Sequence, residues 1–229
     1  MCYHVSTPDK RRLSKAVPKI KIGEDLPGYE HVSGFERPFL YTTLSSDQET
    51  AVPSRWKLLP GYVKNEEEAK KYANTLNANS DGIFVTKSYS PFIERYKGLL
   101  WVEGFYEPHY PEGAKKSENY FIYRPGKAIF TLGIVYAPWV NRDTGEMINT
   151  FSIITTEATP QMAIIHNQKK RMPLIIGENQ RSAWLNAHEK EEIQQFFVPY
   201  DGTLEAEKIE TRVTGGKQKD KENPQGSLF

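Results

Sequence analysis

Aromatic and β-branched residues recur in four short segments in the middle of the chain, with turn-forming residues between them. These segments cover residues 98–107, 119–124, 128–136 and 148–156. Segments of this composition and length are typical of β-strands. Since no helical pattern lies between them, we expect neighbouring strands to pair in antiparallel fashion.

Helical patterns are fewer and shorter. Asn65 is followed by three acidic residues, which predicts an N-capped helix over residues 65–73. Ser90-Pro91 predicts a short helix over 90–97, and residues 180–196 predict a broken pair of helices. The whole pattern predicts an α+β fold, with a predominantly antiparallel, barrel-like β-sheet core and a few short helices.

The end of the chain differs in composition from the rest. Residues 211–224 are polar, charged and contain Gly and Pro, so we expect one folded domain over 1–210 and a flexible tail over 211–229. The tail nevertheless ends in apolar Leu228 and Phe229, which have no core to join.

Composition narrows the class of protein. Hydrophobic residues make up 38% and aromatic residues 12%, enough for a core without metal or disulfides. No run of 18 apolar residues predicts a membrane span, and no apolar run follows the N-terminal charges to form a secretory signal. The single cysteine cannot form an internal disulfide, so a cytoplasmic setting is the default expectation.

Charge is balanced overall but uneven locally. The 30 basic and 29 acidic residues give a net charge of +1, which excludes a protein that binds nucleic acid by overall charge alone. Residues 10–21 hold six basic residues and no acid. This segment is either a local basic face or a solvated arm.

Cys2, the only cysteine, directly follows the initiator Met. Chance placement at a frayed terminus is one interpretation. The other requires removal of Met1, which gives Cys2 an α-amine and a thiol on adjacent carbons, with ordinary pKa values of about 8 and about 8.5. Such a 1,2-aminothiol condenses with an aldehyde to an imine, and the thiol then closes a five-membered thiazolidine ring.

Two further places carry groups suited to acid–base chemistry. Glu103 and Glu107 lie on one face of the expected strand, and burial would raise the pKa of either. The alternative is a solvent-facing sheet surface. His166 precedes the cations of 169–171, which suits a phosphate-bearing substrate, although a lone histidine is also commonly a core residue. Asn77 falls in a segment that reads as a loop.

Together these residues resemble one family, the SRAP (SOS response-associated peptidase) family of abasic-site processing proteins. The resemblance covers residues 2–215 and rests on four motifs in order: Met1-Cys2, N-A-x-x-[ED] at 77–81, E-G-F-Y-E at 103–107, and a His followed by R-M-P at 166–173. Trp56 to Gly61, 120–123 and 151–155 add support.

The resemblance implies a function and roles for individual residues. Cys2 would form a covalent link to abasic sites in single-stranded DNA, with weak lyase activity and self-removal of Met1 as companions. Glu107 would act as acid and base, Asn77 would orient Cys2, and His166 would assist sugar-ring opening and reversal. DNA contacts would come from His4, Asn79, Lys87, Thr155, Lys169, Lys170 and Arg171.

The chain also departs from the family pattern. The family begins C-G-R and has N-A-R, whereas this chain has Cys2-Tyr3-His4 and Asn77-Ala78-Asn79, so two phosphate-binding arginines are absent. The spacing between His166 and Arg171 is longer than the family's H-x-R. Lys169, Lys170 or Arg171 would then supply the missing charge.

Two other functions stay open at this point. One is a cysteine peptidase or amidohydrolase with Cys2 as nucleophile, assisted by His166 and Glu107. The other is a nucleic-acid binding module without covalent chemistry. The five histidines show no zinc-binding spacing, so we expect neither metal nor cofactor.

The expected partner is single-stranded DNA with abasic sites, bound by a monomer in the cytoplasm, associated with the nucleoid. A second partner is indicated by Gln225-Gly-Ser-Leu-Phe229, which resembles the sliding-clamp peptide Q-L-[SD]-L-F at four of five positions. Gln225, Leu228 and Phe229 would be the anchors, on a tether of about a dozen residues.

Overall fold

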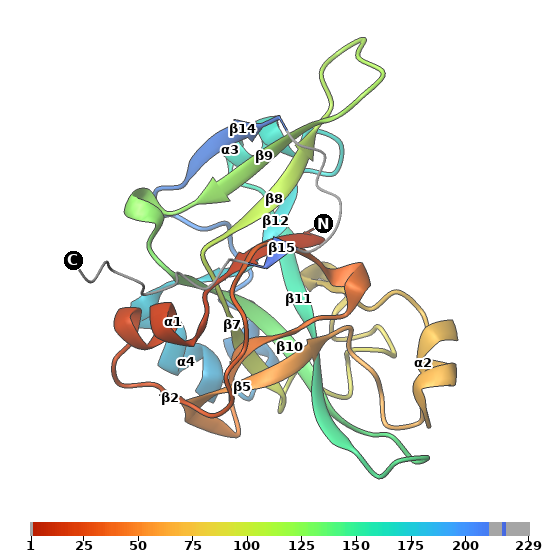
Figure 1. Cartoon of the computed structure of the whole chain (residues 1–229). Coiled ribbons are helices and arrows are strands. Elements are labelled where there is room, and N and C mark those ends of the chain that lie inside the picture. The colour runs from red at the N-terminus through yellow and green to blue at the C-terminus, as the bar shows by residue number, and fades with distance from the viewer. Residues whose placement is uncertain (1, 211–216, 219–229) are drawn as a thin grey trace, which may run out of the picture.

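Two sheets form the body of the protein, seen in a computed structural model that describes residues 2–210 and 217–218 (Figure 1). The first sheet has six strands in the order β14-β9-β8-β1-β3-β15, and all its pairings are antiparallel. Its strands are β1 (His4–Thr7), β3 (Tyr29–Ser33), β8 (Gly104–His109), β9 (Glu118–Tyr123), β14 (Glu205–Ile209) and β15 (Lys217–Gln218).

The second sheet has nine strands and curls into a barrel. Its main order is β12-β11-β10-β7-β4-β5-β2, and a parallel pairing of β11 with β5 closes the ring. β13 adds to β10 and β6 adds to β11. The strands are β2 (Lys21–Ile22), β4 (Phe39–Leu44), β5 (Asp47–Trp56), β6 (Asn77–Asn79), β7 (Lys97–Val102), β10 (Phe130–Val140), β11 (Met147–Glu157), β12 (Arg171–Pro173) and β13 (Ile175–Ile176).

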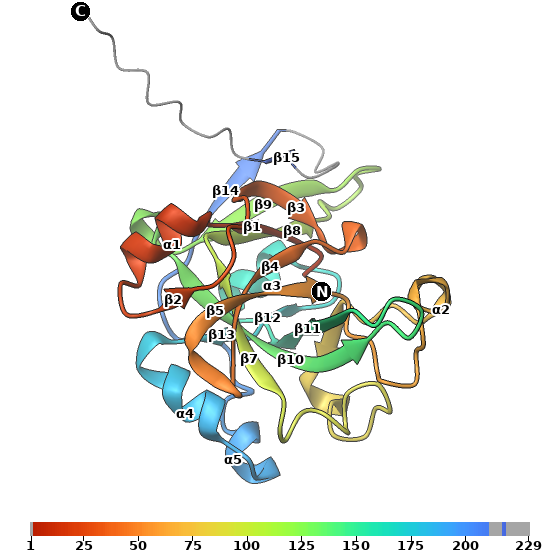
Figure 2. The ribbon, with the colours of Figure 1, turned by 60° about the horizontal axis from the view of Figure 1, so that its bottom comes forward.

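Short helices lie around the sheets (Figure 2). They are α1 (Lys10–Ala16), α2 (Glu66–Lys71), α3 (Pro160–Ile165), α4 (Arg181–Asn186) and α5 (Lys190–Gln194), with 3-10 turns η1 (Gly34–Glu36), η2 (Ser80–Gly82), η3 (Pro125–Lys127) and η4 (Glu178–Gln180). The mostly antiparallel, barrel-like α+β class predicted from the sequence is confirmed. So are the Asn65 cap of α2, whose side chain accepts a hydrogen bond from Glu68 N, and the broken pair α4–α5.

Two expected elements differ from the structure. The helix predicted over 90–97 is wrong: residues 91–95 form hydrogen-bonded turns, and Lys97 already begins β7. The buried Lys97 ammonium donates to the carbonyl of Glu94 at 2.8 Å, so it closes this turn from within. The strand predicted over 98–107 is two strands, because the chain bends at Glu103 and passes from the barrel into the first sheet.

Between the two sheets lies the main hydrophobic core, which contains Cys2, Phe105, Met162 and Ile165. A second cluster packs beneath α4 and α5, and all four tryptophans are at most 1% exposed. Among the described residues, no helix is long and apolar enough to cross a membrane. The tail predicted over 211–229 lies outside the described residues, except for Lys217–Gln218 in β15.

Gly104 is required by the packing of β8 on β9, and we expect Gly104→Ala to lower the free energy of unfolding by about 3 kcal/mol, the upper end for overpacking. A Cβ there would overlap the ring of Phe121 and lie 2.7 Å from the carbonyl oxygen of Ile122. Urea unfolding measures the loss. Gly61→Ala is the matched control, since its Cβ would meet nothing within 4 Å. Equal stability of the two variants would contradict this packing argument.

Candidate functional site

Glu107 is a fully enclosed carboxyl group on β8. β1 flanks this strand on one side and β9 on the other, with Tyr120 directly opposite Glu107. The side chain of Glu107 has no exposed surface. Burial in this dry setting raises its pKa to about 7. Both the acid and the carboxylate are therefore populated near neutral pH, which suits a group that gives and takes protons.

His166 faces Glu107 from the end of α3. Its backbone N–H donates to Met162 O and terminates the helix. Its Nδ1 lies 2.7 Å from the carbonyl oxygen of Arg171 and 3.8 Å from Oε2 of Glu107. Because a carbonyl only accepts, Nδ1 carries the proton in this contact, and Nε2 keeps its lone pair. Burial lowers the pKa of His166, so the neutral ring is favoured.

Cys2 lies just before β1, in the core next to this pair. Its thiol is fully buried and donates to the carbonyl of His4 at 3.6 Å. Burial, and then the negative charge of Glu107, raise the pKa of this thiol. The register pairs His4 with Tyr106, and one further step along both strands sets Tyr3 opposite Glu107. Cys2, Glu107 and His166 thus come together from distant parts of the sequence.

Asn77 begins β6, a short strand on β11, so the loop expected there is a strand. Within the described part of the chain, neither atom of its buried side-chain amide has a hydrogen-bond partner, and the same holds for Oγ1 of Thr155. Leu76, the preceding residue, packs in the same core cluster as Cys2. Buried polar groups without partners are costly, so these two groups are suited to meeting a ligand.

The residues expected to contact DNA fall into two groups: some are bonded within the protein, and others are exposed to solvent. His4 and Arg171 are occupied within the protein. His4 Nδ1 lies 3.0 Å from His31 Nε2, and burial together with His31 lowers the pKa of His4 to about 4, so it carries no charge at neutral pH. Asn79 accepts a hydrogen bond from Asp81 N. Lys87, Lys169 and Lys170 are exposed. These DNA-contact roles stay predictions.

Arg171 ties together the elements around His166. Its guanidinium pairs with Asp81 at 2.7 Å and donates to Ser80 Oγ and to the carbonyl of Thr155. Its own carbonyl accepts the proton of His166. This anchoring role of Arg171 was not predicted from the sequence, although the acid of N-A-x-x-[ED] and the Arg of R-M-P have the opposite charges that indicate an ion pair.

Glu103 and His109, at the two ends of the E-G-F-Y-E-P-H segment, also fix the site. Glu103 accepts a hydrogen bond from Ser6 Oγ at 3.2 Å and pairs with Arg12 Nε at 2.8 Å, which ties α1 to the bend before β8. His109 Nδ1 contacts the carbonyl of Ile164 at 2.9 Å and so holds the end of α3 against β8. Glu103 and Glu107 therefore have separate partners.

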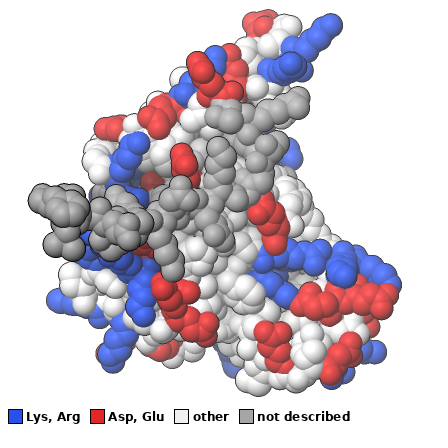
Figure 3. Space-filling view, viewed as in Figure 1, with Lys and Arg blue, Asp and Glu red and all other residues white. Residues whose placement is uncertain are grey.

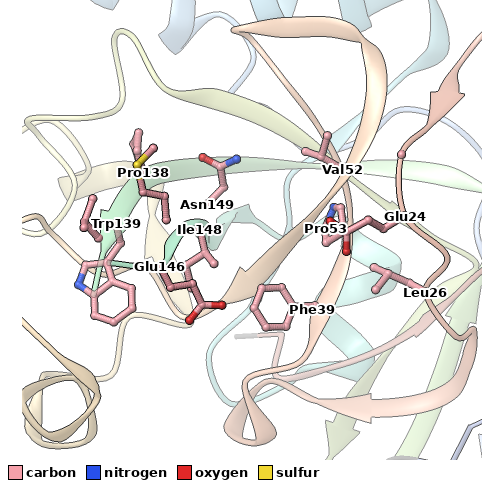
Figure 4. A pocket seen from close by; sticks show the side chains of 13 residues that line it. Glu24, Leu26, Phe39, Val52, Pro53, Pro138, Trp139, Glu146, Ile148 and Asn149 are labelled. Carbon is pink, nitrogen blue, oxygen red and sulfur yellow. The ribbon is translucent and has the colours of Figure 1, made fainter. Parts of the chain in front are cut away.

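A cavity of about 640 Å³ lies elsewhere, between β5 and the β10–β11 hairpin (Figure 4). It is lined by apolar side chains such as Phe39, Pro53 and Ile148 and by the carboxylates of Glu24 and Glu146. None of the predicted site residues lines it. In the part of the chain that the structure describes, no group of three or more His, Cys, Asp or Glu is placed to hold a metal ion.

The sequence matches a known protein family over nearly its whole length. The model of the SOS response associated peptidase family, SRAP, matches residues 1–215. The chain belongs to this family.

Individual relatives narrow the comparison. The chain is similar to "Abasic site processing protein HMCES" of Pongo abelii, with 26% identity over 192 residues, 70% of this chain and 53% of that protein. The protein of the same name from Gallus gallus is 27% identical over 161 residues, 62% of this chain and 46% of that protein. The chain spans about half the length of these curated relatives.

Solved structures share the fold. A crystal structure of a protein from Bacteroides thetaiotaomicron has a TM-score of 0.80 and 30% identity, and the match covers 91% of this chain and 92% of that one. A protein from Bordetella bronchiseptica has a TM-score of 0.77 at 20% identity, over 92% of this chain and all of the other.

Proposed function

We propose that this protein senses abasic sites in single-stranded DNA and joins them covalently through Cys2 after removal of Met1. One observation carries the proposal: a buried carboxyl with a pKa of about 7 lies beside the only cysteine and 3.8 Å from a neutral histidine. An abasic sugar in its open form presents an aldehyde, the partner that a 1,2-aminothiol requires. The relatives named as abasic-site processing proteins support the same substrate.

The reaction proceeds in two steps. The α-amine of Cys2 adds to the aldehyde carbon, and protonated Glu107 gives its proton to the resulting hydroxyl, which leaves as water. Glu107, now a carboxylate, takes the thiol proton, and the sulfur adds to the iminium carbon to close the thiazolidine. The sum is aldehyde plus aminothiol giving thiazolidine plus water, and Glu107 ends as it began.

The other groups support these steps. Nε2 of His166 is unprotonated in this tautomer, so it can remove the sugar hydroxyl proton when the ring opens and return it on reversal. The side chain of Asn77 orients the Cys2 terminus. Thr155, with Lys87, Lys169 and Lys170, contacts the DNA backbone. The imine also permits β-elimination, which gives a weak lyase activity.

A cysteine peptidase would need a different arrangement. In such an enzyme the cysteine is a thiolate beside an imidazolium, and the second ring nitrogen of that histidine donates a hydrogen bond to a carboxylate. Here the pKa of Cys2 is raised, and Nδ1 of His166 is directed at a backbone carbonyl, with Glu107 beyond hydrogen-bond distance. Any peptidase activity is therefore assigned to the Met1–Cys2 bond of the chain itself.

Intact-mass measurement tests the proposal. The chain without Met1 is incubated with a single-stranded oligonucleotide that carries one abasic site, and the adduct is expected at the summed mass minus one water. An oligonucleotide whose abasic aldehyde has been reduced to an alcohol is the control and should give no adduct. A covalent adduct with the alcohol, or none with the aldehyde, contradicts the proposed chemistry.

The proposed function includes a second partner, recognised by the C-terminal tip. Leu228 and Phe229 enter an apolar pocket of a sliding clamp while Gln225 hydrogen-bonds at its rim, which brings the catalytic domain to replicating DNA. A peptide of the last fifteen or so residues should bind the clamp with a Kd below ~100 μM, a weak affinity by ordinary scales. Unchanged binding after Phe229→Ala would contradict this role.

A further inference from the structure

Two aromatic rings lie together directly beside the candidate site. The ring of Tyr3, the residue after Cys2, is 5.1 Å from the ring of Phe35, at an interplanar angle of 33°. Phe35 is 61% exposed, whereas Tyr3 is partly buried. A large apolar ring that rests on another ring and presents most of its surface to solvent gains little for folding. Its position suits the stacking of a flat ligand group.

The backbone fixes the place of Phe35. The N–H of Gly34 donates to the carbonyl of Tyr3 at 2.9 Å, which joins η1 to the start of β1. A Cβ on Gly34 would lie 2.9 Å from the ring of Trp56, so η1 sits tightly on the barrel. Ser33 Oγ accepts from Phe35 N and caps the turn. The exposed ring is therefore held in place before any ligand arrives.

A cation follows this ring in the chain. Arg37 closes η1 in the left-handed region, with φ of 55°, and no ion-pair partner for it is found among the described residues. Arg37 and Arg55 both lower the pKa of Lys57, after burial, which places three cations in one neighbourhood. Figure 3 shows Lys and Arg side chains gathered in a band on the side of η1 and α2.

Most of this charge is already compensated. Arg55 pairs with Glu66, and the ammonium of Lys57 donates to the carbonyls of Ala69 and Tyr72. Arg37 thus remains for an external anion. An exposed ring with a cation two residues further along the chain matches one repeating unit of single-stranded nucleic acid, a base and its phosphate.

Tyr3 connects this surface to the chemistry. The pKa of Tyr3 is raised by burial and then by the charges of Glu107 and Cys2, so its hydroxyl lies within electrostatic range of the reacting groups. A base stacked on this pair would therefore belong to the nucleotide next to the one whose sugar reacts at Cys2.

We propose that Tyr3 and Phe35 form a stacking platform for the base next to the abasic site, with Arg37 contacting the adjoining phosphate. This inference rests on the proposed function for its register. The occupant is a nucleobase of single-stranded DNA, since the bases of a duplex are stacked on one another and do not present a free face to Phe35. The platform therefore favours strands that have a base next to the abasic site, and it does not distinguish between bases by their hydrogen-bonding edges.

A binding cycle tests the platform without any covalent step. The abasic residue is replaced by tetrahydrofuran, which has no aldehyde. The oligonucleotide carries adenine on both sides of it, or has further tetrahydrofuran residues in place of those adenines, and Kd is measured by fluorescence anisotropy. For the unaltered chain, loss of the flanking bases should weaken binding about tenfold. Phe35→Ala should weaken binding of the adenine-flanked strand by a similar factor and abolish the difference between the two strands.

Matched variants separate stacking from other effects. Phe35→Tyr keeps an aromatic face and should retain the difference, whereas Phe35→Leu keeps apolar bulk only and should lose it. Met147→Ala, an exposed apolar residue near the tip of the β10–β11 hairpin, should leave both Kd values unchanged. Arg37→Gln should weaken both strands alike and lower the salt dependence.

The outcomes decide between two failures. If the unaltered chain binds both strands equally, or if Phe35→Ala retains the difference, the platform is overturned even where covalent adducts form. If Phe35→Ala abolishes the difference in Kd between the two strands while no adduct forms with the aldehyde strand, the platform is supported and the crosslinking proposal fails.

Discussion

Cys2→Ala, in a chain freed of Met1, is expected to form no DNA adduct that survives denaturation. The alanine variant keeps the α-amine and can still form an imine, but it has no thiol to close the ring. Imines hydrolyse back, whereas the thiazolidine holds the carbon through both nitrogen and sulfur. Denaturing gels and intact mass, after incubation with abasic single-stranded DNA, measure the loss.

Cys2→Ser makes this experiment sharper. Its hydroxyl is a poor nucleophile at neutral pH, so we expect it to behave nearly as the alanine variant does. Borohydride added during the reaction should trap the imine of both variants, which shows that the amine and the DNA-binding surface are intact. A stable adduct of Cys2→Ala without reductant would show that another residue reacts.

Glu107→Gln should slow adduct formation by about 10²- to 10⁴-fold, the usual contribution of a positioned acid–base group. Glutamine keeps the size of the side chain and can donate a hydrogen bond, but it cannot transfer a proton. The measurement is the single-turnover rate from pH 5 to 9. In the unaltered chain the rate should change near pH 7, where Glu107 titrates, and this change should be absent in the variant.

Stability gives an independent check on the same carboxyl. Because its pKa is about 7 in the fold and ~4.3 when unfolded, the folded state holds an extra proton between these values. The free energy of unfolding should therefore fall as pH rises from 4 to 7 and level off above. Glu107→Gln should remove this slope and exceed the unaltered chain in stability at pH 8. If Glu107→Gln kept both the pH dependence of the unfolding free energy and the rate of adduct formation of the unaltered chain, the acid–base role of Glu107 would be ruled out.

Local sequence signals predicted the strands well and the irregular segments poorly. The strand composition of 119–124 and the cap at Asn65 are short-range features, and the structure confirms both. The prediction of a helix at 90–97 was wrong because Lys97 belongs to β7, where its ammonium closes the preceding turn. The break at Glu103 was not predicted, because a bend that carries the chain from one sheet to the other does not change the alternation of side chains along the sequence.

The candidate site was predictable in its residue types but not in its assembly. A terminal cysteine and the acid of E-G-F-Y-E could be selected from chemistry and family resemblance. The tautomer of His166 depends on the carbonyl of Arg171, and a backbone atom carries no sequence signal. Arg171 looked like a phosphate ligand, whereas its guanidinium pairs with Asp81, 90 positions earlier in the chain. The exposed position of Phe35 likewise depends on its neighbour Gly34, which lies closely against the ring of distant Trp56.

The burial of Cys2 also governs what happens to the protein when no damaged DNA is present. Oxidants and alkylating reagents attack thiolates that they can reach, and this sulfur has no exposed surface and a raised pKa. If Cys2 reacts once per molecule, as the proposed function requires, its burial protects it from oxidation under peroxide stress, the same conditions that damage DNA bases. Surveys that rank cysteines by their labelling with iodoacetamide would score this one as inert.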